Sequence, residues 1–447
     1  MTRIERDPLG EKPVPAEAYY GIQTLRAVEN FPISGLHAQP DLIAATVLIK
    51  RAAAQANASL GRLDQTIAKA IVDAADEILA GRYRDQFVVD VYQAGAGTSH
   101  NMNANEVLAN LAAERLGGAR GMYDRVHPND HVNMSQSTND VFPSATRVAL
   151  LMASVGLVEV ARELARALDE KAVAFQDILK TGRTHLQDAV PMTLGQEFGG
   201  FAANVARGAD DVEHARDQLR ELNLGATAVG TGLNAGDDYV SRAIAFLNDA
   251  TEGRLHLRAA TNRFRVTQSM GDVLAFSGAV RRLAVEVGKI ASDLRLLSMG
   301  PRAGLGEIVL PAVQPGSSIM PGKVNPSVPE MVNQVVFQVI GCDTTITVAC
   351  EAGQLELNVM MPVIAWNGLH ADAERARELL DRSTAAATAL SPYIGYAATA
   401  DLAKTAVATG RSLRELVLER QLLPADRLDA ILSVKAMTQP GVVGSEK

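Results

Sequence analysis

The sequence predicts an all-α protein whose core is a bundle of unusually long helices. Apolar residues recur at gaps of three and four positions over several long stretches of the chain. Aromatic residues account for only 4% of the 447 residues while alanine and leucine are abundant, and this composition favours helix packing over a β-sandwich. Strand patterns are short and sparse, around 13–20 and 86–92.

Five long helices are expected in order along the chain. The first follows an apolar stripe from Val148 to Leu179, about nine turns or roughly 45 Å long. The other four are expected over about 194–222, 264–298, 328–350 and 354–390. These helices define a central domain at 139–391, between a mostly helical N-terminal domain at 1–138 and a small helical C-terminal domain at 392–447.

The helix expected over 328–350 is apolar around much of its circumference, with Val332, Val335, Val339 and Ile346 among its residues. A helix that is apolar on most sides is normally buried on most sides. Five helices in one rod cannot bury it in this way. We therefore expect several subunits to pool their helices in a common core.

Composition and charge exclude several classes of protein. The net charge of −8 argues against nucleic acid or an anionic membrane as a partner. No uninterrupted apolar run is long enough to cross a membrane, and the N-terminus lacks the apolar core of a signal peptide. Cys342 and Cys350 lie eight residues apart on an apolar helix, as buried free thiols would, so a cytoplasmic location is expected.

The most informative segment is 316–326, which reads Gly-Ser-Ser-Ile-Met-Pro-Gly-Lys-Val-Asn-Pro. Directly after it, Ser327 and Glu330 have the spacing of a capping box at the start of a helix. The segment is therefore expected to be a loop that brings two hydroxyls and Lys323 to the positive end of that helix. Such an arrangement is suited to bind an anion.

Three further segments combine polar side chains with expected helix starts, namely 95–106, 135–140 and 182–188. In the first, Asn103 and Glu106 have N-cap and N3 spacing, and the third is followed by Thr193 and Gln196 with the same pattern. Each segment alone could simply satisfy helix amides. Together with the loop, they predict a site for a dianion built from helix dipoles and hydroxyls.

Metal and dinucleotide sites find little support. The chain has no Cys-x-x-Cys or His-Glu-x-x-His motif, and its eight histidines are scattered. The pairs Gly95-x-Gly97 and Gly230-x-Gly232 follow no expected strand and lack a complete nucleotide-binding fingerprint. We therefore expect neither a metal nor an organic cofactor.

The four polar segments resemble the successive motifs of the fumarase/aspartase superfamily, whose members eliminate a group β to a carboxylate and release fumarate. The resemblance covers nearly the whole chain. Three positions resemble the aspartase branch more than class II fumarases: Tyr20, where fumarases usually carry Trp, Ala226, where they prefer Gly, and Gln354-Leu355, where they typically read Asn-Phe.

The resemblance implies reversible deamination of L-aspartate to fumarate and ammonia without a cofactor. It also implies a homotetramer with a 20-helix core, in which three subunits contribute to each active site. Two alternatives remain: a class II fumarase acting on malate and fumarate, and a non-catalytic structural or binding protein on the same scaffold. Intact Ser317, Lys323 and His185 argue against the second alternative.

The reaction itself indicates which groups matter. When the β-proton leaves, the neighbouring carboxylate must take up a second negative charge as an aci-carboxylate, so preorganised donors at that group should contribute most. The resemblance assigns this role to Thr98, Ser137, Thr138 and Ser318. It places Thr184, Lys323 and Asn325 at the α-carboxylate, and Asn139 and His185 at the amino group.

By resemblance, Ser317 is the base that removes the proton. An ordinary serine is far too weak for this, so its alkoxide would need loop amides, a helix N-terminus and nearby positive charge. Chemistry alone would choose a rival, His185 paired with Glu330. The glycine and proline content of 300–326 suggests a loop that closes over the substrate.

Two features depart from the family pattern. His100 stands where relatives usually have a small residue, either as a packed donor behind the site or as a change in substrate preference. Between Met361 and Ser391 the chain is shorter than its relatives by on the order of twenty residues, or about 30 Å of helix. The entry to the C-terminal domain must therefore be rebuilt, although no site motif lies in this segment.

Overall fold

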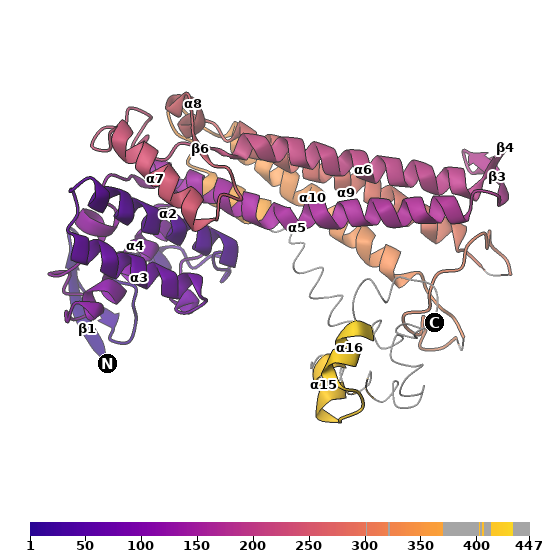
Figure 1. Cartoon of the computed structure of the whole chain (residues 1–447), viewed down its shortest axis with the longest axis horizontal. Coiled ribbons are helices and arrows are strands. Elements are labelled where there is room, and N and C mark those ends of the chain that lie inside the picture. The colour runs from indigo at the N-terminus through magenta and orange to yellow at the C-terminus, as the bar shows by residue number, and fades with distance from the viewer. Residues whose placement is uncertain (301, 321, 370–401, 403–404, 406–412, 432–447) are drawn as a thin grey trace. The chain divides into compact units, whose positions relative to one another are not determined.

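The computed structural model describes residues 1–300, 302–320, 322–369, 402, 405 and 413–431 (Figure 1). It confirms the all-α prediction, because helices dominate the described residues and the strands there form three small two-stranded sheets. The chain divides into two compact units, 1–290 with 332–371 and 291–331 with 372–447. The domain boundaries expected from the sequence stay a prediction.

The N-terminal part of the first unit is a group of short helices with a β-hairpin at its start. The hairpin pairs β1 (Thr2–Asp7) with β2 (Gly10–Pro15), and the helices are α1 (Ile22–Asn30), α2 (Pro40–Ser59), α3 (Gln65–Leu79) and α4 (Thr98–Arg115). Helices α2, α3 and α4 bury apolar side chains such as Val47, Ile71 and Leu108 in one core.

The strand expected around 13–20 is present in part as β2, but the one expected at 86–92 does not form. There, only an isolated bridge joins Asp90 to His37. The Asp90 carboxylate accepts hydrogen bonds from the backbone N–H groups of Ser34 and Gly35 at 2.7 and 2.8 Å. Hydrogen bonds to a side chain therefore hold this segment, where the sequence pattern suggested a strand.

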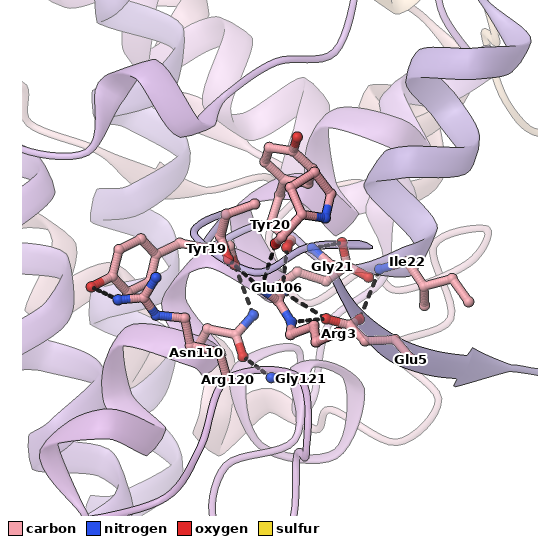
Figure 2. A network of polar contacts seen from close by, with 12 residues as sticks. Arg3, Glu5, Tyr19, Tyr20, Gly21, Ile22, Glu106, Asn110, Arg120 and Gly121 are labelled. Atoms are coloured by element: carbon pink, nitrogen blue, oxygen red, sulfur yellow. Dashed lines mark hydrogen bonds and ion pairs between the residues drawn. The ribbon is translucent and has the colours of Figure 1, made fainter. Parts of the chain in front are cut away.

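Two buried carboxylates hold the start of α1 (Figure 2). The four successive backbone N–H groups of 21–24 donate to them at distances between 2.9 and 3.1 Å, three to Glu106 from α4 and one to Glu5 from β1. The first N–H groups of a helix have no partner within it, and Gly21 offers no capping side chain. The two carboxylates take the place of that cap, although burial raises the pKa of Glu106.

Four of the five expected long helices are confirmed. They are α5 (Thr138–Ala174), α6 (Leu194–Leu219), α9 (Gly271–Leu297) and α10 (Ser327–Glu351). Helices α5 and α6 run side by side along their length (Figure 1). Of the fifth, expected over 354–390, the structure describes the helix α11 (Met361–Leu369). Residues 354–360 form turns and an isolated bridge instead of a helix, and 370–390 lie outside the described residues.

Helix α5 begins ten residues before the apolar stripe from which it was predicted. Ser137 and Asp140 form a capping box at its start, and the fully buried Arg147 pairs with Asp272 at 2.6 Å two to three turns later. By length and mean hydropathy alone, α5 contains a stretch that could cross a membrane. Because 72% of that stretch is buried inside the protein, α5 is a core helix.

The apolar stripe also misplaced the end of α5, because Leu179 belongs to a β-hairpin and not to the helix. The hairpin pairs β3 (Leu179–Thr184) with β4 (Gln187–Thr193) and connects α5 to α6. Thr193 and Gln196 then form the expected capping box of α6.

The remaining elements are short. In the first unit they are η1 (Arg84–Gln86), η2 (Gly95–Gly97), the π-helix η3 (Pro128–Val132), β5 (Glu221–Leu222), α7 (Asp237–Ala250), β6 (Arg258–Ala259) and α8 (Arg263–Gln268). The second unit contains α15 (Leu413–Glu419) and α16 (Ala425–Ile431).

Candidate active site

Thr98 is the first residue of α4, and its hydroxyl is exposed at the start of that helix. The preceding Gly97 has φ 82°, and a Cβ there would overlap the ring of Phe142, so only glycine fits this turn. The capping role expected for Asn103 and Glu106 is wrong, because both lie in the interior of α4. Helix α4 starts six residues earlier than that pattern suggested.

The start of α5 lies directly beside that of α4. Asn101, one turn into α4, donates a hydrogen bond from Nδ2 to Thr138 Oγ1 at 3.0 Å. Ser137 is the N-cap of α5, and its Oγ accepts a hydrogen bond from the Asn139 backbone N–H at 3.2 Å. The structure therefore brings Thr98 and Ser137–Asn139 together at two adjacent helix N-termini, both of which favour negative charge.

Asp140 connects the start of α5 to another segment. One carboxylate oxygen accepts a hydrogen bond from the Ser137 backbone at 2.9 Å, and the other accepts two from the backbone of Gly225 and Thr227 at 2.8 and 3.0 Å. Burial raises the pKa of Asp140 to about 7, despite these hydrogen bonds. The segment that contains Ala226 is thereby fixed against the candidate site.

Lys50 is a buried lysine that contacts the segment just before α5, and it was not predicted from the sequence. It lies in α2, and its Nζ donates to Asn133 Oδ1 at 2.8 Å and to Gln136 Oε1 at 2.9 Å. Burial lowers the pKa of Lys50 to about 7, and the charge of Asp140 acts in the opposite direction. The available signal was a lysine within the apolar run of α2.

His100 is packed inside the protein behind Thr98. Its Nε2 lies 3.0 Å from Thr46 Oγ1, and that hydroxyl donates to the Leu42 carbonyl at 2.8 Å. Nε2 must therefore carry the proton and donate to Thr46. Burial lowers the pKa of His100 to about 4, and its ring meets Phe142 edge to face, so it serves as a neutral packed donor.

The loop 316–326 belongs to the second unit, and its geometry centres on Ser317. Ser317 Oγ accepts hydrogen bonds from the backbone N–H groups of Ile319 and Met320 at 3.2 and 3.0 Å. Two amides that point at one hydroxyl oxygen stabilise negative charge on it. The loop amides are one of the three features that a serine alkoxide was expected to need.

Two hydrogen bonds close this loop. Gly316 N–H donates to the Lys323 carbonyl at 2.7 Å, and Asn325 Nδ2 donates to the Gly316 carbonyl at 2.8 Å. A Cβ at position 316 would lie 2.7 Å from Asn325 N and 2.8 Å from Lys323 O, so a glycine is required there. Ser327 is the first residue of α10 rather than its N-cap, one position away from the expected capping box.

Thr184 and His185 lie at the turn of the β3–β4 hairpin, where His185 is exposed and has φ 55°. This segment was expected near a helix start, but it lies beyond the C-terminal end of α5 (Figure 1). The 37 residues of α5 span roughly 55 Å. Within one chain, the structure therefore does not bring Thr184 and His185 together with Ser137–Asn139.

Comparison with known families identifies the family of this chain. A family model described as "Lyase" matches residues 10–341, and a second one, described as "Fumarase C C-terminus", matches residues 387–439. The chain belongs to the fumarase/aspartase lyase family. The first match includes all ten residues that the sequence analysis assigned to the site.

Relatives in this lyase family are similar along their whole length. Proteins named aspartate ammonia-lyase from Bacillus sp. and Bacillus subtilis are 48% and 46% identical, and the alignments cover 99% of this chain and 98% of each relative. The one from Escherichia coli is 47% identical over 98% of this chain and 96% of its own length. The shortening near 361–391 stays a prediction, because residues 370–391 lie outside the described part.

Solved structures of the lyase family have the same fold. One is titled a fumarate lyase:delta crystallin from Brucella melitensis bound to cobalt, with a TM-score of 0.80, 48% identity and coverage of 98% of this chain and 100% of that one. Another is a class II fumarase from Schistosoma mansoni, with a TM-score of 0.81, 35% identity and the same coverage.

Proposed function

We propose that this protein is an aspartate ammonia-lyase, which converts L-aspartate reversibly to fumarate and ammonia. The observation that carries the proposal is the pair of backbone amides directed at Ser317 Oγ. They supply part of the stabilisation that a serine base requires. Relatives 46–48% identical over nearly their whole length carry the same name, which supports aspartate as the substrate.

In the proposed mechanism, the Ser317 alkoxide removes the β-proton of aspartate. The electron pair moves into the adjacent carboxylate, which becomes a doubly charged aci-carboxylate. The donors proposed to stabilise it are Thr98, Ser137, Thr138 and Ser318. The positive ends of α4 and α5 act on the same group, because their first residues are among these donors.

The other end of the substrate would be held by different groups. Lys323, Asn325 and Thr184 are proposed to bind the α-carboxylate, with Lys323 as the fixed cation. Asn139 Nδ2 donates to the Ala228 carbonyl at 2.9 Å, so its Oδ1 is the atom left to accept a hydrogen bond from the substrate ammonium. His185 would face the same group, and ammonia would leave from there.

The active site is proposed to be composite, in a homotetramer. Within one chain, roughly 55 Å of α5 separates Ser137–Asn139 from Thr184–His185. Helix α10 presents apolar side chains both inside and outside, since Val336 and Ile346 are buried while Phe337 and Val348 are more than 60% exposed. Neighbouring subunits would cover this outer face and bring the three motifs together from three chains.

The proposal also includes a cellular location and a C-terminal domain. Cys342 and Cys350 are free thiols, and a cytoplasmic location is proposed on that basis. A C-terminal helical domain over 392–447 is supported by the family match at 387–439.

An absorbance assay tests the function. Fumarate formation in the ultraviolet is followed with L-aspartate and with L-malate in parallel. We expect turnover of aspartate and far slower turnover of malate. Faster turnover of malate would make this protein a fumarase, to which the 35% identical structure points. Binding of fumarate without turnover of either substrate would identify a non-catalytic scaffold protein.

A further inference from the structure

A chain of hydrogen bonds connects buried Lys50 to the proposed substrate-binding residue Thr138. Lys50 Nζ donates to Asn133 Oδ1 at 2.8 Å, and the same oxygen faces Asn101 Nδ2 at 3.3 Å. Asn101 Nδ2 in turn donates to Thr138 Oγ1 at 3.0 Å. Lys50 and Asn101 are almost completely buried, so water cannot substitute for these partners.

Lys50 determines which group donates and which accepts in each of these hydrogen bonds. A lysine amine offers N–H donors, so the two amides that it contacts, Asn133 and Gln136, must turn their oxygens toward it. A neutral amine still has two N–H groups for these two oxygens, so the orientation does not depend on the charge of Lys50. With Asn133 Oδ1 fixed, Asn101 has to present its Nδ2.

The orientation of the Asn101 amide leaves a buried oxygen without a hydrogen bond, which indicates that its neighbours impose this orientation. Among the described residues, Asn101 Oδ1 accepts no hydrogen bond, and the same is true of Asn105 Oδ1, whose amide also donates to Asn133 at 3.2 Å. Both side chains are buried, where an unpaired amide oxygen is unfavourable. Turning the Asn101 amide would instead place two oxygens against each other at Asn133.

We propose that Lys50 is a positioning residue, which fixes the amides of Asn133 and Asn101 and thereby directs the Thr138 hydroxyl proton toward the substrate carboxylate. Thr138 Oγ1 accepts from Asn101, and its single proton is therefore left for another acceptor. If the Asn101 amide were turned around, the Thr138 hydroxyl could donate to Asn101 Oδ1 instead. The inference rests on the proposed function, because it requires Thr138 to bind substrate.

A double-mutant cycle tests the inference in the full-length enzyme. Lys50→Met keeps the length of the side chain and removes its donors. Asn101→Asp replaces the donor to Thr138 by an acceptor. We expect each variant to lower kcat/KM for L-aspartate by roughly 10- to 100-fold, as for a lost hydrogen bond to a charged group. Adding Thr138→Val to either should lower it no further.

Two controls isolate the pathway. Thr98→Val removes a hydroxyl that donates to the Gly95 carbonyl, outside this chain of bonds, so its loss should multiply with that of Lys50→Met. Lys69→Met, at an exposed position on α3, should leave kcat/KM unchanged.

The outcomes separate this inference from the proposed function. If Thr138→Val multiplies fully with both Lys50→Met and Asn101→Asp, the positioning role is wrong while the site stands. If Thr138→Val alone leaves kcat/KM unchanged, the site assignment fails and the inference fails with it. If Lys50→Met does not fold, the pair Asn101→Asp and Thr138→Val decides by the same criterion.

Discussion

At the scale of single residues, Ser317 is the proposed base, and its removal should stop the reaction without unfolding the protein. Ser317→Ala deletes the oxygen to which Ile319 and Met320 donate, so we expect kcat to fall by roughly 100- to 10,000-fold with little change in KM. Initial rates with L-aspartate and the melting temperature measure the two effects.

The matched control is Ser327→Ala, at the start of α10, which should retain activity. His185→Ala should raise KM more than it lowers kcat. A larger loss of kcat in His185→Ala than in Ser317→Ala would make the histidine the base and leave the serine a binding role only.

The burial of His100 should make the free energy of unfolding depend on pH. Its pKa is about 4 in the folded protein against an ordinary value of 6.5, so the unfolded chain takes up this proton first. The free energy of unfolding should therefore fall as the pH falls from 6.5 to 4, by roughly 3 kcal/mol from this residue. Denaturant titrations at several pH values measure this.

In the variant His100→Gln, most of that dependence should disappear, whereas His256→Gln, at an exposed position, should keep it. Identical pH profiles for His100→Gln and the unmodified protein would contradict the burial of a neutral histidine.

The sequence pointed to individual candidate site residues but not to the residues that contact them. Thr98, Ser137 and Thr138 could be found because polar residues at helix starts form recognisable patterns. Lys50 and Asn101 could not, since they contact residues 83 and 37 positions away through tertiary packing. Loop amides near Ser317 were expected from the sequence. Which amides donate to it became known only from the backbone of the loop.

At the scale of elements, the start of α1 depends on a side chain from another helix. Glu106→Ala would leave three backbone N–H groups in 21–24 without their buried acceptor. Because an unsatisfied buried donor is costly, we expect the free energy of unfolding to fall by roughly 3 kcal/mol or more. Chemical denaturation followed by circular dichroism measures the change.

Glu29→Ala on the same helix is the matched control. Glu29 pairs with Lys12 at the surface, where an ion pair contributes at most about 1 kcal/mol. Equal destabilisation by the two substitutions would show that the buried network of Figure 2 adds nothing beyond the loss of a surface charge.

Helix periodicity identified the long elements but not their ends. Leu179 continued the stripe of α5 by chance, so the β3–β4 hairpin was missed. The start of α4 was placed too late because Gly97, in a left-handed conformation, ends the preceding turn without any capping side chain. Boundaries depend on such local backbone geometry, which a periodic pattern does not contain.

At the scale of the whole molecule, a mixing experiment tests the composite site. Inactive Ser317→Ala and Thr184→Val proteins are denatured together and renatured. If the loop and the hairpin of one site come from different chains, roughly one site in four in random hybrids is free of both lesions. We therefore expect up to about a quarter of the original specific activity to return.

The matched control mixes Ser317→Ala with Lys323→Ala. Both lesions lie in the same loop, so every site receives one of them and no activity should return. Native mass spectrometry confirms that hybrids form. Hybrids without activity in the first mixture would place the loop and the hairpin of each site on one chain.

The expectation that several chains assemble concerned the whole molecule and not a local segment. It came from a helix at 328–350 with too many apolar sides, and the exposed Phe337 and Val348 on α10 agree with it. The number of subunits and their arrangement cannot be derived from one chain, because they depend on surfaces that meet only in the assembly.

The length of α5 has a consequence for newly synthesised protein. A chain that has folded alone holds Ser137–Asn139 and Thr184–His185 roughly 55 Å apart, and a substrate as small as aspartate cannot bridge them. Catalysis should therefore begin only when chains meet, so its appearance during refolding should accelerate with protein concentration. Loss of activity on dilution would likewise report dissociation of chains that are still folded.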